Sequence, residues 1–236
     1  QLLNLQRSSD GRKFGDFLAT LTEKIAADDR IRVFTSSEVV EQSGFVGSFE
    51  TDIVMPSGVT RTLKHGAILV ATGAEENRPE IHGLGTLDTV MTQTDFEAAL
   101  ENGKAADWQH SRVVMLQCAG SRDEEHLPYC SRVCCNHAIK NGARFKEMFP
   151  EARVDVLYRD MRCYGLGELD YRAARRAGVN FIRFDPEENP PEIKTEETGI
   201  EINVTDPSIR LPVRLHPDLL VLSTDMKPRD TEELAS

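Results

Sequence analysis

Val113-Val114-Met115-Leu116-Gln117-Cys118 is a continuous apolar run that leads through a glutamine to a cysteine. Four apolar residues in succession fit a strand that is covered on both faces of a sheet. The segments after it alternate in type, and we expect a helix at 132–148, a strand at 154–158, a helix at 168–177 and a strand at 179–182. This order predicts an α/β fold, a Rossmann-type parallel sheet with right-handed crossovers.

The flanking segments extend this prediction in both directions. We expect further strands at 200–204 and 219–222, and an exposed acidic, proline-rich loop at 185–198. Before Trp108 the pattern predicts helices at 14–27 and 95–100, a strand at 31–34, a β-hairpin formed by 49–55 and 60–64, and a doubly covered strand at 67–71. The polar stretch 101–107 divides the chain into expected domains at 1–107 and 108–236.

Composition and charge exclude several classes of partner. The 236 residues include 28 Lys and Arg against 39 Asp and Glu, a formal net charge of −11, which argues against nucleic acid or an anionic membrane surface. No apolar run reaches the roughly 20 residues of a membrane-spanning helix, so we expect no direct membrane insertion. Gln1–Arg7 has no signal-peptide pattern, and an odd number of cysteines fits a reducing, cytoplasmic compartment. The missing initiator Met suggests an internal piece of a longer protein.

Four of the five cysteines lie in one loop-to-helix segment, as Cys118, Cys130, Cys134 and Cys135. Cys130 and Cys134 are four residues apart, so on a helix their Cβ atoms would lie about 5–6 Å apart on one face. Cys118, at the end of a buried strand, is placed to supply a fourth ligand from the opposite side. This grouping indicates an iron–sulfur cluster held by four thiolates.

Two other interpretations of the cysteines remain open. A zinc site would stabilise a structural or docking domain, although adjacent cysteines are atypical of zinc knuckles. A redox dithiol of Cys130 and Cys134 would make the chain a thiol–disulfide reductase, although C-x₂-C is the usual spacing. Cys163 stands apart as an ordinary thiol, and His126 and His137 are candidates for ligands or for donors to ligands.

Several runs resemble the family of heterodisulfide reductase A-subunits, including the related flavin/iron–sulfur subunits of quinone-interacting membrane-bound oxidoreductase complexes. The specific runs are Gln117–Glu125, Tyr129–Cys135 and Tyr158–Arg162, and weaker similarity extends to Ser36–Val39, Gly44–Phe49 and Ala71–Ala74. The resemblance therefore covers nearly the whole chain.

The resemblance implies a thioredoxin-reductase-like flavoprotein with an FAD-binding half and a nicotinamide-domain-like half. Members of the family pass electrons between FAD and [4Fe–4S] clusters inside multisubunit complexes, so other subunits are the expected partners. The turn after Leu116 holds cysteines and an insertion in place of a G-x-G-x-x-G phosphate turn. We therefore expect the cluster to occupy the place of the nicotinamide cofactor, and no NAD(P) site.

The same resemblance nominates residues on the flavin side. They are Val39 and Val40 and the turn Ala71-Thr72-Gly73. Lys140, on the helix after Cys134 and Cys135, is either a solvated helix cation or a cation near the isoalloxazine. The G-x-G-x-x-G loop of an FAD site is absent too, so the FAD half is incomplete. We expect this chain to retain little FAD and to be inactive as an oxidoreductase by itself. The family often has glycine where Asp225 stands, a departure that argues against close contact between that loop and a cofactor.

Overall fold

The computed structural model describes residues 14–196 and 198–229. The expectation for Gln1–Arg7 lies outside these residues. At the centre is a five-stranded parallel sheet in the order β5-β12-β6-β7-β8. Its strands are β5 (Val90–Thr92), β6 (Arg112–Gln117), β7 (Arg153–Tyr158), β8 (Val179–Arg183) and β12 (Leu219–Ser223). The predicted α/β class with a parallel sheet is confirmed.

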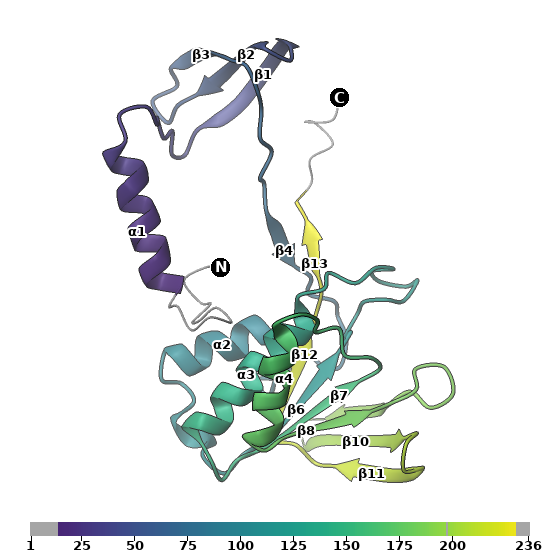
Figure 1. The fold of residues 1–236 in the computed structure, drawn as a ribbon. Helices are drawn as coiled ribbons and strands as arrows, with labels where there is room; N and C mark the ends of the chain where they lie inside the picture. Colours follow the sequence, from purple (N-terminus) through teal and green to yellow (C-terminus); the bar gives the residue numbers. More distant parts are fainter. Residues whose placement is uncertain (1–13, 197, 230–236) are drawn as a thin grey trace.

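Three helices cover one face of this sheet (Figure 1). They are α2 (Gln93–Glu101), α3 (Cys134–Met148) and α4 (Gly167–Arg176). Alternate residues of a strand point to opposite faces, so Val113 and Met115 of β6 face this helical layer and pack into a core with Phe96 and Phe145. Thr92 closes a capping box with Asp95 at the start of α2.

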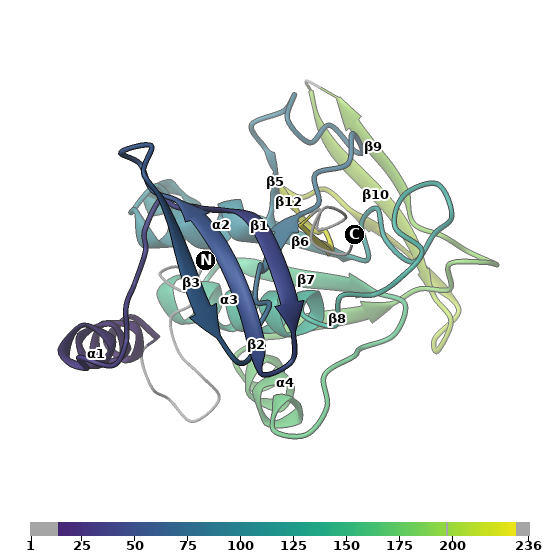
Figure 2. The same cartoon turned by 90° about the horizontal axis from the view of Figure 1, so that it is seen from above.

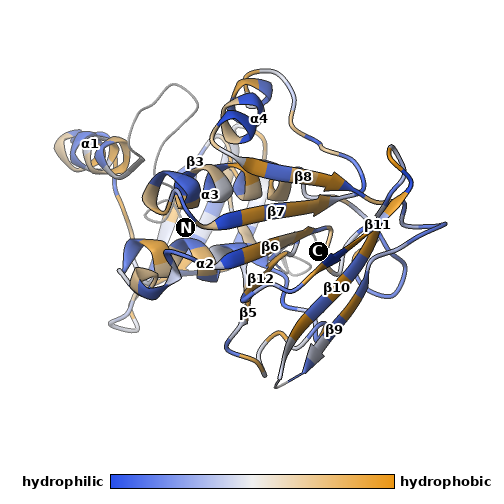
Figure 3. Cartoon of the chain, turned by 90° about the horizontal axis from the view of Figure 1, so that it is seen from below, coloured by the Kyte–Doolittle hydropathy of each residue, from blue (hydrophilic) through white to orange (hydrophobic). Residues whose placement is uncertain are grey.

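A second, antiparallel sheet covers the opposite face (Figure 3). It comprises β9 (Glu192–Glu196), β10 (Gly199–Asp206) and β11 (Leu211–Leu215), in the order β11-β10-β9. Val114 and Leu116 of β6 pack here against Ile202 of β10. The strand predicted at 200–204 is confirmed as β10, and it belongs to this second sheet. The loop predicted for all of 185–198 is wrong, because β9 pairs with β10 along its length.

The N-terminal elements lie at one end of the molecule (Figures 1 and 2). They are α1 (Phe14–Ala27) and an antiparallel sheet of β1 (Glu38–Phe45), β2 (Ser48–Val54) and β3 (Thr60–His65). β4 (Ala74–Glu76) and β13 (Met226–Pro228) pair to connect this end with the parallel sheet. The predicted hairpin is confirmed. Ala106–Trp108 form a single 3₁₀ turn between α2 and β6.

Two predicted strands are wrong. Residues 31–34 and 67–71 are irregular, and Leu69 is 92% exposed where the prediction placed a covered strand. A strand requires a neighbour for its N–H and C=O groups, and no strand of the described residues pairs with either segment. Both segments are as apolar as a covered strand, but no layer within the described part of the chain covers them.

The division of the chain at residues 107 and 108 stays a prediction. β5 and α2 precede that point, and they pack on the same sheet as the elements that follow it. Among the described residues, no helix is long and apolar enough to cross a bilayer.

Substituting Phe145 tests the helical layer of the core. Its ring is fully buried and lies 5.4 Å from Phe96 and 6.3 Å from Trp108, between ring centroids. We expect Phe145→Ala to lower the free energy of unfolding by about 3–5 kcal/mol, because it leaves a cavity. Urea unfolding followed by the fluorescence of Trp108, the single tryptophan, measures this change.

Phe45→Ala is the matched control, because Phe45 in β1 is 72% exposed. We expect a change within about 0.5 kcal/mol for this variant. Equal urea midpoints for the two variants would contradict the assignment of Phe145 to the core.

Candidate functional site

The cysteine segment lies at the carboxyl edge of the parallel sheet. Cys118 directly follows β6, and Cys134 and Cys135 are the first two residues of α3. Residues 119–133 form the loop between them. In α/β proteins this edge is where ligands bind, because loops and helix N-termini converge there. The cysteines therefore occupy the place of a phosphate-binding turn, as the sequence predicts.

The backbone of this loop adopts costly conformations. Cys118, Arg122 and Arg132 have φ values of 58°, 57° and 63°, in the left-handed region that non-glycine residues avoid. Each such residue costs of the order of 1 kcal/mol and persists only where its surroundings enforce it, often at functional sites. Gly120 also has a positive φ, and a Cβ atom there would meet Pro79 Cγ at 2.5 Å. Glycine is therefore required at position 120.

Cys118 lies between an apolar environment and a guanidinium group. Burial raises the pKa of its thiol to about 11, while Arg122 opposes that shift. Arg122 Nη1 lies 3.9 Å from Cys118 Sγ and also donates to Asp160, so the guanidinium is fixed at the thiol. The negative charges of thiolates at Cys135 and Cys130 also contribute to raising the pKa of Cys118.

Cys134 and Cys135 lie next to each other at the start of α3. A hydrogen bond from Cys134 lowers the pKa of Cys135, and the same hydrogen bond raises the pKa of Cys134. No side chain caps the N-terminus of α3, so the helix dipole acts directly on these thiols.

Cys130 is half-buried, and Arg132 N–H donates to its sulfur at 3.4 Å. Cys163 is buried in the segment before α4 and, like the other four, is a free thiol. Burial and the nearby Glu168 raise the pKa of Cys163. Within the part of the chain that the structure describes, no three His, Cys, Asp or Glu side chains already stand close enough to hold a metal ion. The four predicted ligands share one region without converging on a point.

Asp225, which the sequence marks only as a departure from the family, also belongs to this region. It follows β12 and is completely buried, and its Oδ1 accepts hydrogen bonds from Ser131 Oγ at 2.5 Å and Cys134 Sγ at 3.3 Å. No local pattern indicates this contact, because 91 residues separate Cys134 from Asp225.

Lys140 and His137 pair with a buried carboxylate. Lys140 Nζ lies 2.5 Å from Glu97 Oε1, and His137 Nε2 lies 2.7 Å from Glu97 Oε2. Burial by itself would raise the pKa of Glu97, but the hydrogen bonds from His137 and Lys140 hold it below the usual range. His126 contacts Asp123 instead, through Nδ1 at 2.9 Å.

The other residues nominated for the flavin side lie far along the chain from the cysteines. Val39 and Val40 are 50% and 55% exposed on β1, and Ala71, Thr72 and Gly73 are exposed in an irregular segment. Gly73 has a φ of 79°, as a tight turn requires.

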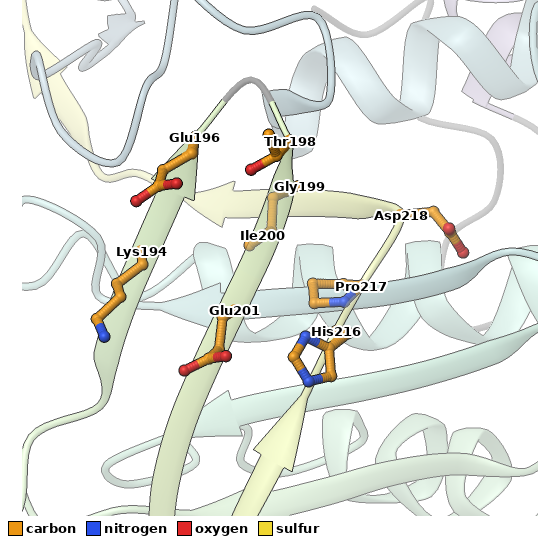
Figure 4. A pocket seen from close by; sticks show the side chains of 9 residues that line it. All are labelled: Lys194, Glu196, Thr198, Gly199, Ile200, Glu201, His216, Pro217 and Asp218. Carbon is orange, nitrogen blue, oxygen red and sulfur yellow. The ribbon is translucent and has the colours of Figure 1, made fainter.

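A polar pocket of about 410 Å³ opens at the opposite edge of the sheet (Figure 4). Its polar lining comes from β9, β10 and the segment before β12, and consists of Lys194, Glu196, Thr198, Glu201, His216 and Asp218. Asp218 accepts a hydrogen bond from the N–H of Arg112, the first residue of β6. Cys118, in contrast, follows the last residue of β6, at the other end of the strand. The pocket is thus separate from the cysteine region.

The fold is shared with flavin-dependent oxidoreductases. Thioredoxin reductase from T. acidophilum superposes with a TM-score of 0.54 and 11% identity, over 97% of this chain and 66% of that protein. The cadaverine monooxygenase DfoA of Erwinia amylovora, solved with bound FAD, gives a TM-score of 0.51 and 9% identity, over 94% of this chain and 59% of that protein. The expected thioredoxin-reductase-like fold is confirmed.

Sequence comparison identifies the family within this class. In Methanopyrus kandleri, the iron–sulfur A-subunit numbered 2 of the CoB–CoM heterodisulfide reductase is 33% identical over 184 residues. The A-subunit of the H₂/formate:CoB–CoM heterodisulfide, ferredoxin reductase of Methanococcus maripaludis is 35% identical over 195 residues. The alignments cover 72% and 73% of this chain. The chain is thus a homologue of the heterodisulfide reductase A-subunits, as its cysteine motifs indicated.

The chain spans 28% of the length of each of these two relatives. No model of a protein family matches it. The two relatives are named as subunits of reductases.

Replacing Glu97 tests the paired carboxylate beneath α3. Because its pKa is lowered in the folded state, ionised Glu97 stabilises the fold above the unfolded glutamate pKa of about 4.3, and this contribution is lost as the pH falls through the folded value. We expect Glu97→Gln to lower the free energy of unfolding at pH 7 by about 1–2 kcal/mol, since charge-assisted hydrogen bonds are lost. Urea unfolding should show a smaller difference from wild type at pH 4.

Glu50→Gln, at the exposed ion pair between Lys64 and Glu50, is the control and should change stability little at either pH. A Glu97→Gln effect that grows on acidification would show that the carboxylate is not stabilised in its ionised form.

Proposed function

We propose that this chain is the electron-transfer part of a flavin/iron–sulfur oxidoreductase subunit, in which Cys118, Cys130, Cys134 and Cys135 bind one [4Fe–4S] cluster. The observation that carries the proposal is the grouping of four thiols at the carboxyl edge of a thioredoxin-reductase-like sheet. A bound cluster would supply a one-electron carrier at this edge.

The donor set fits such a cluster chemically. Thiolates are the soft ligands that iron–sulfur clusters require, and four of them complete the coordination of a cubane. Cys118 comes from a strand end, Cys130 from the loop, and Cys134 and Cys135 from a helix start. These origins differ enough for the sulfurs to approach a group from several sides.

Two neighbouring features favour the thiolate state that the ligands need. The uncapped N-terminus of α3 stabilises negative charge at Cys134 and Cys135. Arg122, held by Asp160, places a positive charge at Cys118 and opposes the effect of burial on its pKa. Burial acts against the thiolates, and the Asp225 carboxylate raises the pKa of Cys134 as well, so metal binding would have to displace these protons.

We propose that the cluster replaces a nicotinamide cofactor. Residues 118–133 stand where a Rossmann fold has its glycine-rich phosphate turn, and Pro79 packs against Gly120, so the backbone there is not open to a pyrophosphate. No NAD(P) is expected at this edge.

The flavin side of the proposal rests on Val39, Val40 and the segment Ala71-Thr72-Gly73, which expose backbone and apolar surface on the N-terminal elements. Lys140 remains the candidate cation. Because it already pairs with Glu97, we expect its charge to act on a flavin together with that carboxylate.

The physiological role follows from the relatives. Their names describe subunits of reductases that act on the CoB–CoM heterodisulfide, in one case with H₂, formate and ferredoxin. We propose that the protein containing this chain passes electrons between FAD and the cluster within such a multisubunit complex, and that the chain alone is inactive.

Substituting single cysteines tests the ligand assignment. After anaerobic reconstitution with iron and sulfide, we expect wild type and Cys163→Ser to bind similar amounts of both. Cys134→Ser should lose most of the iron and the electron paramagnetic resonance signal of the reduced cluster, because serine is a poor replacement for a soft ligand. Its far-ultraviolet circular dichroism should match wild type, since the sheet has its own core.

Loss of iron in Cys163→Ser with retention in Cys134→Ser would overturn the assignment. One zinc per chain without iron or sulfide would favour the zinc-stabilised docking domain. A disulfide that forms reversibly between cysteines of the loop, in a chain that binds no metal, would favour the thiol–disulfide reductase.

A further inference from the structure

Asp225 joins the end of β12 to the cysteine loop. Ser223, the last residue of β12, lies beside Gln117 of β6 in the parallel register, and Cys118 follows Gln117. Asp225 comes two residues after Ser223 and has no exposed surface. The strand pairing thus places a buried carboxyl group next to the segment that carries the cysteines.

The carboxylate is incompletely satisfied. Oδ1 accepts hydrogen bonds from Ser131 and Cys134, but Oδ2 is buried and has no hydrogen-bond partner within the described chain. An unpartnered buried carboxylate oxygen carries a desolvation cost. Such a group in a native fold calls for an explanation, and both contacts that it makes lead to the 130–135 segment.

The backbone around Asp225 is fixed from two sides. Asn77 N–H donates to the carbonyl oxygen of Asp225 at 2.7 Å, and Ala119 N–H donates to that of Ser223 at 3.2 Å. The side chain therefore extends from a rigid base. Cys130–Val133, in contrast, belong to no helix or strand. The ordered strand end thus constrains the loop through Ser131 and Cys134.

We propose that Asp225 is a positioning residue for the cysteine loop: its carboxylate accepts from Ser131 and, in the metal-free chain, from the Cys134 thiol, and it places a negative charge beside the ligand sulfurs. The positioning of the loop does not depend on the proposed function, whereas the effect of the negative charge on a bound cluster rests on it. A negative charge close to a redox centre disfavours the added electron, so Asp225 would also lower the reduction potential of the cluster.

The first test uses the metal-free chain. The rate at which N-ethylmaleimide alkylates each cysteine is measured by mass spectrometry, in wild type, Asp225→Asn and Asp225→Ala. We expect about fivefold faster alkylation of Cys134 in Asp225→Ala, the effect of about one lost hydrogen bond on local opening. Asp225→Asn should give a rate between those of wild type and Asp225→Ala, because its amide oxygen still accepts from Ser131 while the negative charge beside the Cys134 thiol is removed.

Asp155→Ala is the matched control. Asp155 is also a buried carboxylate with one unpartnered oxygen, but it lies in β7 and accepts from Asn180. Its substitution should leave the ratio of Cys134 to Cys163 alkylation unchanged. If Asp225→Ala also speeds the alkylation of Cys163, the Ser131→Ala variant decides, because Ser131 lies in the loop outside the sheet. Faster alkylation of Cys134 alone in Ser131→Ala supports the proposal. An unchanged alkylation rate of Cys134 in Ser131→Ala overturns it.

The second test uses the anaerobically reconstituted chain. We expect Asp225→Asn to bind as much iron and sulfide as wild type and to show a higher midpoint potential, and Asp225→Ala to bind several-fold less. Wild-type protein that takes up no iron or sulfide contradicts the proposed function, and the alkylation rates still decide the positioning role. Wild-type alkylation rates in both Asp225→Ala and Ser131→Ala overturn the positioning role, and an unchanged potential in an iron-loaded Asp225→Asn overturns the effect of charge.

Discussion

The parallel pairing of β6 with β12 is the interaction on which the rest of the structure depends. It joins segments 106 residues apart in the sequence, and the buried side chains of Gln117 and Ser223 hydrogen-bond across it at 2.7 Å. Because both strands end at the same edge, whatever follows them must meet. Cys118 follows one strand and Asp225 follows the other, and α3 begins above them. The chemistry of the site is thus a consequence of strand register.

Part of this arrangement could be predicted from the sequence. Val113–Leu116 and Leu219–Leu222 are uniformly apolar because helices cover one face of their sheet and a second sheet covers the other. The density of cysteines after β6 marked the site because few folds place four thiols so close by chance. The role of Asp225 could not be predicted, because it arises from a contact with a residue 91 positions away in the sequence. Its complete burial could not be predicted either, since a polar residue in a loop is usually exposed.

The errors have physical causes that can be named. Ile68, Leu69 and Val70 are as apolar as a central strand, but composition does not reveal whether neighbouring strands are present in the described chain. The charged residues of β9 made this strand resemble a loop. It is an edge strand with one face in solvent, so only its alternate residues, Ile193 and Thr195, are partly buried. Local sequence patterns therefore reveal neither the pairing of a strand nor the burial that depends on it.

The length of the loop between β6 and α3 bears on how the site is assembled in time. Loop-closure entropy grows slowly with length, about 0.6 kcal/mol for each doubling, so the sheet can form around this crossover before the cysteines are arranged. β12 is the last strand of the sheet in the sequence, and on a ribosome it emerges after β5, β6, β7 and β8. Until it docks, Cys134 has no carboxylate beside it. The hydrogen bonds of Ser131 and Cys134 to Asp225 therefore cannot form until the last strand of the sheet has been synthesised.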